Sequence, residues 1–154
     1  MQRGKYISSR DFKLFTSVNN ELMDDVMEII VSIFKISPET QTNIYGEVSQ
    51  KTGKWYYSPI EVSSIPERPE MTSDDEGFGV NRSQTHIFKF LESELKRINF
   101  YPEHGDLILY NDKYFEINNV VQEQLLGGQP DKSFSIICNA QYTTLSSIQI
   151  VPRI

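Results

Sequence analysis

The chain has 154 residues, the length of one ordinary domain, and it can bury a hydrophobic core without disulfides or metals. Its formal net charge of −6 argues against a general nucleic-acid binder, because affinity for phosphate backbones comes from basic clusters. Its single cysteine excludes an internal disulfide, and no run of about 18 apolar residues supports a membrane span. We therefore expect one β-rich domain over residues 1–154, with no membrane association.

The N-terminal residues mix basic and aromatic side chains without a clear period. Residues 1–14 predict an extended arm that becomes ordered on a partner, with a frayed edge strand as the alternative. The candidate contact residues in this arm are Arg3, Lys5, Tyr6 and Phe12.

The next twenty residues contain two overlapping patterns. Leu22 and Val26 fit a helical stripe, whereas the β-branched density after Glu28 favours a strand. We expect a short helix over residues 18–25, followed by a strand that ends near Pro38.

The middle of the chain predicts strands on either side of a long acidic loop. Residues 55–62 and 84–91 have strand patterns, and residues 92–100 favour a short helix or turn. Residues 66–80 are rich in Pro, Gly and acidic side chains, which predicts a long surface loop. The acidic loop and the basic N-terminus could attract each other between neighbouring copies. The candidate contact residues in the loop are Asp74, Asp75, Glu76 and Phe78.

The last third of the chain has the most regular pattern. Two strand-like runs flank Asn111-Asp112, a pair that tolerates the positive φ of a tight hairpin turn. Apolar and polar residues alternate over residues 134–142, as in a half-buried strand. Residues 122–133 combine two glycines with a proline and predict a projecting loop. The candidate contact residues in this loop are Leu125, Leu126 and Gln129.

Six or seven short strands with hairpin connections indicate a mainly β fold. We expect a small antiparallel β-barrel or sandwich with a short N-terminal helix, an extended N-terminal arm and long loops.

No motif in the sequence indicates catalysis, a metal site or a cofactor. The two histidines, His86 and His104, lack the spacing of metal ligands, and there is no nucleophile elbow or phosphate-binding loop. The acidic run that begins at Asp74 lacks the ligand spacing of a calcium loop. We expect the His86 ring to pack beside Phe88, and Cys138 to be a small buried side chain.

Five segments, taken in order, carry a resemblance to a known family. They are Asn20-Glu-Leu, Asn43-Ile-Tyr-Gly-Glu, the Tyr-Pro-Glu-x-Gly-Asp run from Tyr101 to Asp106, Tyr114-Phe-Glu-Ile, and the closing strand that carries Cys138. With these segments the chain resembles the neck proteins of contractile-tailed bacteriophages, the head closure or connector proteins that join the portal to the tail.

The resemblance implies a structural virion protein without enzymatic activity or cofactor. It implies a homo-oligomeric ring, with a hexamer favoured and a dodecamer possible, between the capsid and the tail. Such a ring would contact a portal or adaptor protein on one side and a tail terminator or other neck protein on the other. It would enclose packaged DNA without sequence-specific binding, and its subunits would be made in the host cytoplasm.

A β-barrel that binds single-stranded nucleic acid is the alternative function. Trp55, Tyr56, Tyr57, Phe88 and Phe90 would be its stacking platforms if their rings are exposed. The net charge argues against this alternative.

Overall fold

The computed structural model describes residues 8–38, 54–67, 70–74, 81–124, 133–144 and 148–150. Within these ranges, the side chains of residues 70–74, 81–83, 124, 148 and 149 are not described. The helices are α1 (Ser9–Glu21), the π-helical η1 (Leu22–Met27) and α2 (Glu92–Arg97). The strands are β1 (Ile30–Phe34), β2 (Lys54–Tyr56), β3 (Ile60–Ser63), β4 (Ile65–Pro66), β5 (Glu70–Asp74), β6 (Asn81–Leu91), β7 (Leu107–Tyr110), β8 (Lys113–Gln124), β9 (Ser133–Thr143) and β10 (Ile148–Ile150).

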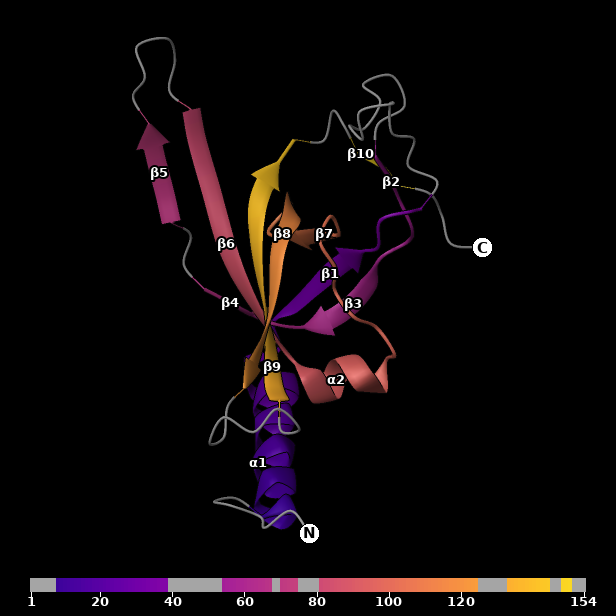
Figure 1. Cartoon of the computed structure of the whole chain (residues 1–154), viewed down its shortest axis with the longest axis vertical. Helices are drawn as coiled ribbons and strands as arrows, with labels where there is room; N and C mark the ends of the chain where they lie inside the picture. Colours follow the sequence, from indigo (N-terminus) through magenta and orange to yellow (C-terminus); the bar gives the residue numbers. More distant parts are fainter. Residues whose placement is uncertain are drawn as a thin grey trace.

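Eight of these strands form one sheet, which confirms the mainly β fold. Its order is β3-β1-β7-β8-β9-β6-β4, with β5 on β6, and every pair is antiparallel. Strands β2 and β10 form a separate parallel pair. The hydrogen-bonded path ends at β3 and at β4, so the sheet does not close into a barrel and is better described as sandwich-like. It is strongly twisted, as Figure 1 shows.

The predicted hairpin and the predicted alternating strand are both present. Asn111 and Asp112 have φ of 48° and 61°, so both lie in the left-handed region that a tight turn between β7 and β8 requires. In β9, Ile136, Cys138 and Ala140 face the core. The β8–β9 register shifts beside Asn118, where a bulge interrupts the ladder.

The main core is a cluster of aromatic and aliphatic side chains. Aromatic side chains from β6 and β8 pack there against aliphatic side chains from β1, β7, β9 and α2. The core residues are Val31, Ile33, Val62, Phe88, Phe90, Leu95, Phe100, Ile108, Phe115, Ile117, Ile136, Cys138 and Ala140. A smaller buried cluster of Phe34, Tyr56 and Leu107 connects β2 to the other side of β1 and β7. Side chains on both faces of β1 are therefore buried.

The N-terminal segment differs from the predicted extended arm. Helix α1 begins at Ser9, and residues 9–14 are therefore helical. The Ser8 hydroxyl accepts a hydrogen bond from the Asp11 backbone N–H, and the Asp11 carboxylate accepts one from Ser8 N–H. This capping box explains why the helix starts nine residues before the predicted boundary at residue 18. Residues 1–7 lie outside the described residues.

The two predicted loops are shorter than the sequence indicated. Strand β5 occupies part of the segment 66–80 and pairs with the first half of β6. Strand β8 extends to Gln124, so the segment 122–133 begins within the sheet. The predicted strand over residues 55–62 is divided into β2 and β3. Residues 75–80 and 125–132 lie outside the described residues.

Candidate functional site

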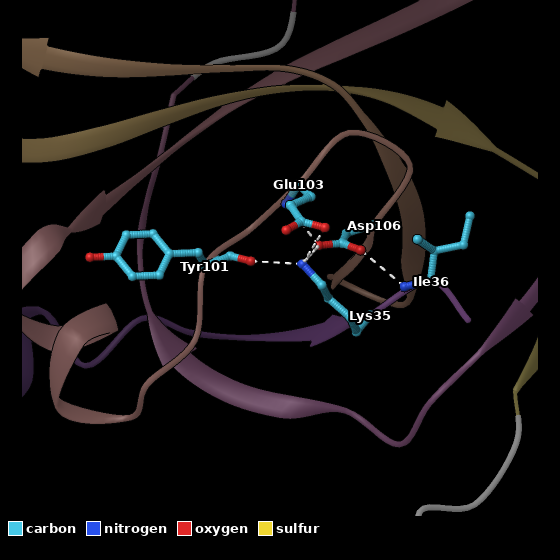
Figure 2. A network of polar contacts seen from close by, with 5 residues as sticks. All are labelled: Lys35, Ile36, Tyr101, Glu103 and Asp106. Atoms are coloured by element: carbon cyan, nitrogen blue, oxygen red, sulfur yellow. Dashed lines mark hydrogen bonds and ion pairs between the residues drawn. The ribbon is translucent and has the colours of Figure 1, made fainter. Parts of the chain in front are cut away.

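A buried carboxylate joins the end of β1 to the loop before β7. Asp106 Oδ1 accepts a hydrogen bond of 2.9 Å from Ile36 N–H. Asp106 Oδ2 accepts hydrogen bonds from Glu103 N–H at 2.8 Å and from Lys35 Nζ at 3.2 Å. Figure 2 shows that these groups converge from two segments that are far apart in the sequence. We call Lys35, Ile36, Tyr101, Glu103 and Asp106 the clasp.

Lys35 is the cation of the clasp. Its Nζ donates a hydrogen bond of 2.9 Å to the Tyr101 carbonyl oxygen and forms an ion pair of 3.0 Å with Glu103 Oε2. The same atom lies 5.5 Å from the centre of the Phe100 ring, within reach of a cation–π interaction. One lysine therefore holds the whole loop from Phe100 to Asp106 against the end of β1.

Burial and hydrogen bonding have opposite effects on the pKa of the Asp106 carboxyl group in the clasp. Burial raises the pKa of Asp106, while the N–H groups of Ile36 and Glu103 and the charge of Lys35 act in the opposite direction. Since the carboxylate is fully buried, loss of any of these partners would leave its charge less well compensated.

The backbone of the loop from Phe100 to Asp106 requires a glycine at position 105. Gly105 has φ of +90°, and a Cβ at this position would lie 3.4 Å from Ile36 Cδ1. Its N–H donates to the Ile117 carbonyl oxygen at 2.9 Å, so the loop is also fastened to β8. The Tyr101–Asp106 motif noted in the sequence thus builds a loop that is bonded to two strands.

His86 is a packed ring, as the sequence predicted. Its centroid lies 4.5 Å from that of Phe115 and 5.8 Å from that of Phe88. The Nδ1 atom is buried and has no hydrogen-bond partner among the described residues, while Nε2 lies 3.0 Å from the Gln84 amide nitrogen. Burial, and secondarily the charge of Lys113, lowers the pKa of His86. The neutral ring is therefore the form that this core accommodates.

Cys138 and His104 also have the environments that were expected. Cys138 is fully buried, and burial raises the pKa of its thiol to about 12, which disfavours the reactive thiolate. His104 is exposed beside the turn at Gly105.

The predicted contact residues are only partly within the described structure. Phe12 is half-buried on α1, and Asp74 ends strand β5, where only its backbone is described. The others lie outside the described residues: Arg3, Lys5, Tyr6, Asp75, Glu76, Phe78, Leu125, Leu126 and Gln129. The structure therefore does not bring the predicted contact residues together.

The sequence analysis missed the exposed apolar face of α1 and η1. Leu14, Val18, Leu22 and Val26 recur at every fourth position and are 66%, 55%, 45% and 70% exposed. We call these four residues the outer stripe. The side facing the body carries both polar and apolar contacts: Asn20 Oδ1 accepts a hydrogen bond of 2.7 Å from Ser93 Oγ, and Met23 is buried. The four-residue spacing was the signal that would have revealed this helical face.

A cavity lies where η1 meets the sheet. Its volume is about 160 Å³, and its apolar walls come from Leu22, Met23, Phe90 and Phe134. Asn19, Lys89, Glu123 and Ser135 contribute its polar groups. Phe15 packs beside it against Phe134, with ring centroids 4.9 Å apart. Helix α1 has no buried residue, whereas Met23 of η1 is buried against the body.

The stacking platforms of the alternative function are not available. Tyr56, Phe88 and Phe90 are fully buried, so their faces cannot stack on bases. Only Trp55 and Tyr57 of that set are even partly exposed. The structure thus overturns the assumption on which a single-strand-binding surface was based.

No group of three or more His, Cys, Asp or Glu side chains that could hold a metal ion occurs in the described ranges. The helices described here are also too short or too polar to cross a membrane.

The fold and the clasp define a mainly β domain built on one strongly twisted antiparallel sheet. No protein-family model matches the chain, and no curated protein matches it. Among solved structures, the chain is similar to a chain in a structure of the virion of a native gene transfer agent particle. The two align with a TM-score of 0.46 and 10% sequence identity, over 75% of this chain and 94% of that chain. Similarity of this extent carries no information on function.

Proposed function

We propose that this chain is a structural virion protein of a phage neck, which forms a ring between the portal and the tail and provides the docking surface for the tail. The observation that carries this proposal is the arrangement of contact elements. Helix α1 projects from one end of the sheet and the β5–β6 hairpin from the other, as Figure 1 shows. A connector needs such elements at both ends, because it meets a different partner on each side.

The surface of α1 supports a role in assembly. Six of the twelve large exposed apolar side chains among the described residues lie on α1 and η1. Such a concentration is typical of a surface that another protein covers.

The framework supports the resemblance to neck proteins. The Tyr101–Asp106 run forms the clasp loop, and Tyr114-Phe-Glu-Ile lies in β8, where Phe115 and Ile117 reach the core. On the other face of β8, Glu116 forms an ion pair with Lys54 of β2. Two of the five segments that carry the resemblance thus contribute contacts that stabilise the sheet. This is what we expect if the resemblance extends to the fold.

The finer features of the proposal concern the ring. A hexamer is favoured and a dodecamer is possible, with a portal or adaptor protein on one side and a tail terminator or other neck protein on the other. The contacts would involve the basic N-terminus, the acidic segment 66–80 and the segment 122–133. A net charge of −6 suits a channel for DNA, because like charge discourages adhesion to phosphates. The proposal assigns no reaction and no cofactor to the chain.

Deletion of the gene from its phage tests this proposal. We expect DNA-filled heads and separate complete tails to accumulate, and the wild-type protein supplied from a plasmid to restore joined particles. A matched plasmid with a stop codon at Tyr6 is the negative control. Electron microscopy of the lysates provides the readout, and tailed, infectious particles without this protein would refute the proposal.

The position and copy number can be measured on the particle itself. Antibody against the chain should label the junction of head and tail, and quantitative mass spectrometry should give six or twelve copies per particle. Labelling confined to the capsid or the distal tail would contradict the neck position.

A further inference from the structure

The outer stripe is an exposed apolar surface on α1 and η1. Leu14, Val18 and Val26 are more than half exposed, and Leu22 is 45% exposed although it also lines the cavity beside the sheet. In a surface helix that acts alone, the apolar stripe faces the core and the polar residues face water. Leu14, Val18 and Val26 depart from this rule, which indicates that a further partner covers this side of α1 and η1.

The charges beside the stripe are divided along its length. Arg10 and Lys13 lie at its start, whereas Glu21, Asp25 and Glu28 lie at its end, and all five side chains are exposed. Asp11 near the start is engaged by Ser8 in the capping box. The helical segment is therefore basic at one end and acidic at the other.

We propose that a second copy of this chain covers the outer stripe, with the two α1–η1 segments antiparallel about a two-fold axis at Val18. In this register, two facing residues have sequence numbers that sum to about 36, because each residue advances both helices by 1.5 Å along their axes. Leu14 of one copy meets Leu22 of the other, and Arg10 lies within one turn of Asp25.

The charges select this orientation over the parallel one. An antiparallel pair places Arg10 and Lys13 near the acidic end of the other copy. A parallel pair would place acidic residues beside acidic residues and basic beside basic, and such juxtapositions are unfavourable. The apolar residues alone would allow both orientations, because their four-residue spacing is the same in either direction.

This pair is a state of the free chain and does not depend on the neck ring. A two-fold contact uses the same surface on both copies and closes at two, whereas a cyclic ring uses two different surfaces. The pair keeps the apolar stripe covered before assembly. An experiment can therefore disprove the two-fold pair without affecting the proposed neck function, and the neck function can be disproved without affecting the pair.

Disulfide trapping tests the register directly. The variant Val18→Cys should form a disulfide-linked dimer on mild oxidation, because the axis brings the two substituted positions together. Leu14→Cys alone should not, since its two copies are eight residues apart, or about 12 Å along the helix. Wild-type protein is the matched control for Cys138, which is fully buried.

Mixing two single-cysteine variants separates the orientations. Leu14→Cys mixed with Leu22→Cys should give a mixed dimer, although neither gives a dimer by itself. A dimer from Leu14→Cys alone would indicate a parallel pair and overturn the proposal. Absence of dimers in every combination would also overturn it, and would assign the stripe to a different protein.

Sedimentation measurements test the energetics without cysteine chemistry. Wild-type protein should show a concentration-dependent dimer, and Val18→Glu should weaken its dissociation constant at least tenfold. Arg10→Glu and Asp25→Arg should each weaken it, and the double variant should recover most of the loss. A monomer at every concentration, or a double variant no better than the singles, would refute the proposal. Circular dichroism checks that each variant is folded.

Discussion

Lys35 is the residue whose loss should damage the framework most. Its removal leaves the buried Asp106 carboxylate without its ion-pair partner and takes away a donor to the Tyr101 carbonyl oxygen. We predict that Lys35→Met lowers the free energy of unfolding by about 2–4 kcal/mol, because breaking a buried ion pair leaves an uncompensated charge. Urea unfolding of the purified variant gives this quantity.

Lys113→Met is the matched control for that substitution, since Lys113 is exposed on β8. Its effect should stay within about 0.5 kcal/mol, as for most surface substitutions. The double variant Lys35→Met with Asp106→Asn should lose less than the sum of the two single losses. Additive losses would show that the clasp residues do not act together.

His86 makes the stability depend on pH. Burial lowers its pKa in the folded protein, so the unfolded chain binds the proton more readily. The stabilising contribution of the neutral ring is complete above the unfolded pKa of about 6.5 and is lost as the pH falls through the folded value. We predict a lower free energy of unfolding at pH 5.5 than at pH 7.5, measured with urea.

His86→Phe tests the origin of this pH dependence. Phenylalanine fits a site already lined by Phe88 and Phe115, and it cannot take up a proton. The variant should therefore lose most of the stability difference between pH 7.5 and pH 5.5. Exposed His104, changed to Gln, provides the control and should leave the difference intact. If His86→Phe retained the full difference, another group would be responsible.

At the scale of single elements, the β7–β8 turn shows what local chemistry can predict. Asn111 and Asp112 were assigned to a tight turn from residue type alone, and both adopt positive φ. Since glycine has no Cβ penalty there, Asp112→Gly should raise the free energy of unfolding by about 0.5–1 kcal/mol. Thermal unfolding is a sufficient measurement, and Asp112→Val should have the opposite effect. A destabilised Asp112→Gly variant would mean that the aspartate side chain stabilises the turn by another route.

Other elements could not be predicted from local sequence patterns, for identifiable reasons. Helix α1 begins at a capping box that the mixed pattern of residues 8–14 concealed, and two of its apolar residues, Leu14 and Val18, are largely exposed. Strand β5 consists largely of polar residues, so only its pairing with β6 defines it as a strand. The strict alternation in β9, by contrast, was sufficient to assign that strand.

The clasp could not be predicted because its partners are distant in the sequence. Lys35 and Asp106 are 71 residues apart, and neither belongs to a recognised motif with the other. The run from Tyr101 to Asp106 was visible as a pattern. The hydrogen bonds that fix its conformation, however, come from the end of β1 and from β8.

At the scale of the whole molecule, stability should be unevenly distributed. Strands β6 and β8 carry most of the aromatic core and β9 packs smaller side chains against it, whereas α1 has no fully buried residue. We predict that amides of α1 exchange with solvent much faster than those of β8 and β9 in dilute protein. Hydrogen–deuterium exchange with mass spectrometry measures this contrast.

Concentration provides the control for the exchange experiment. If a second copy covers the outer stripe, protection of α1 should increase with protein concentration, while that of β8 and β9 stays constant. Equal protection of α1 and the central strands in dilute protein would contradict the distribution of burial described above.

The two ends of the hydrogen-bonded path are separated by one residue of chain, Ser64. On one side β3 pairs with β1, and on the other β4 pairs with β6. Ser64 itself donates to Ile29 O through its N–H and to Lys89 O through its hydroxyl. An added or deleted residue here would slip one ladder and turn its inward side chains outward. The connection at Ser64 is therefore a point where a change in chain length should disturb both ends of the sheet at once.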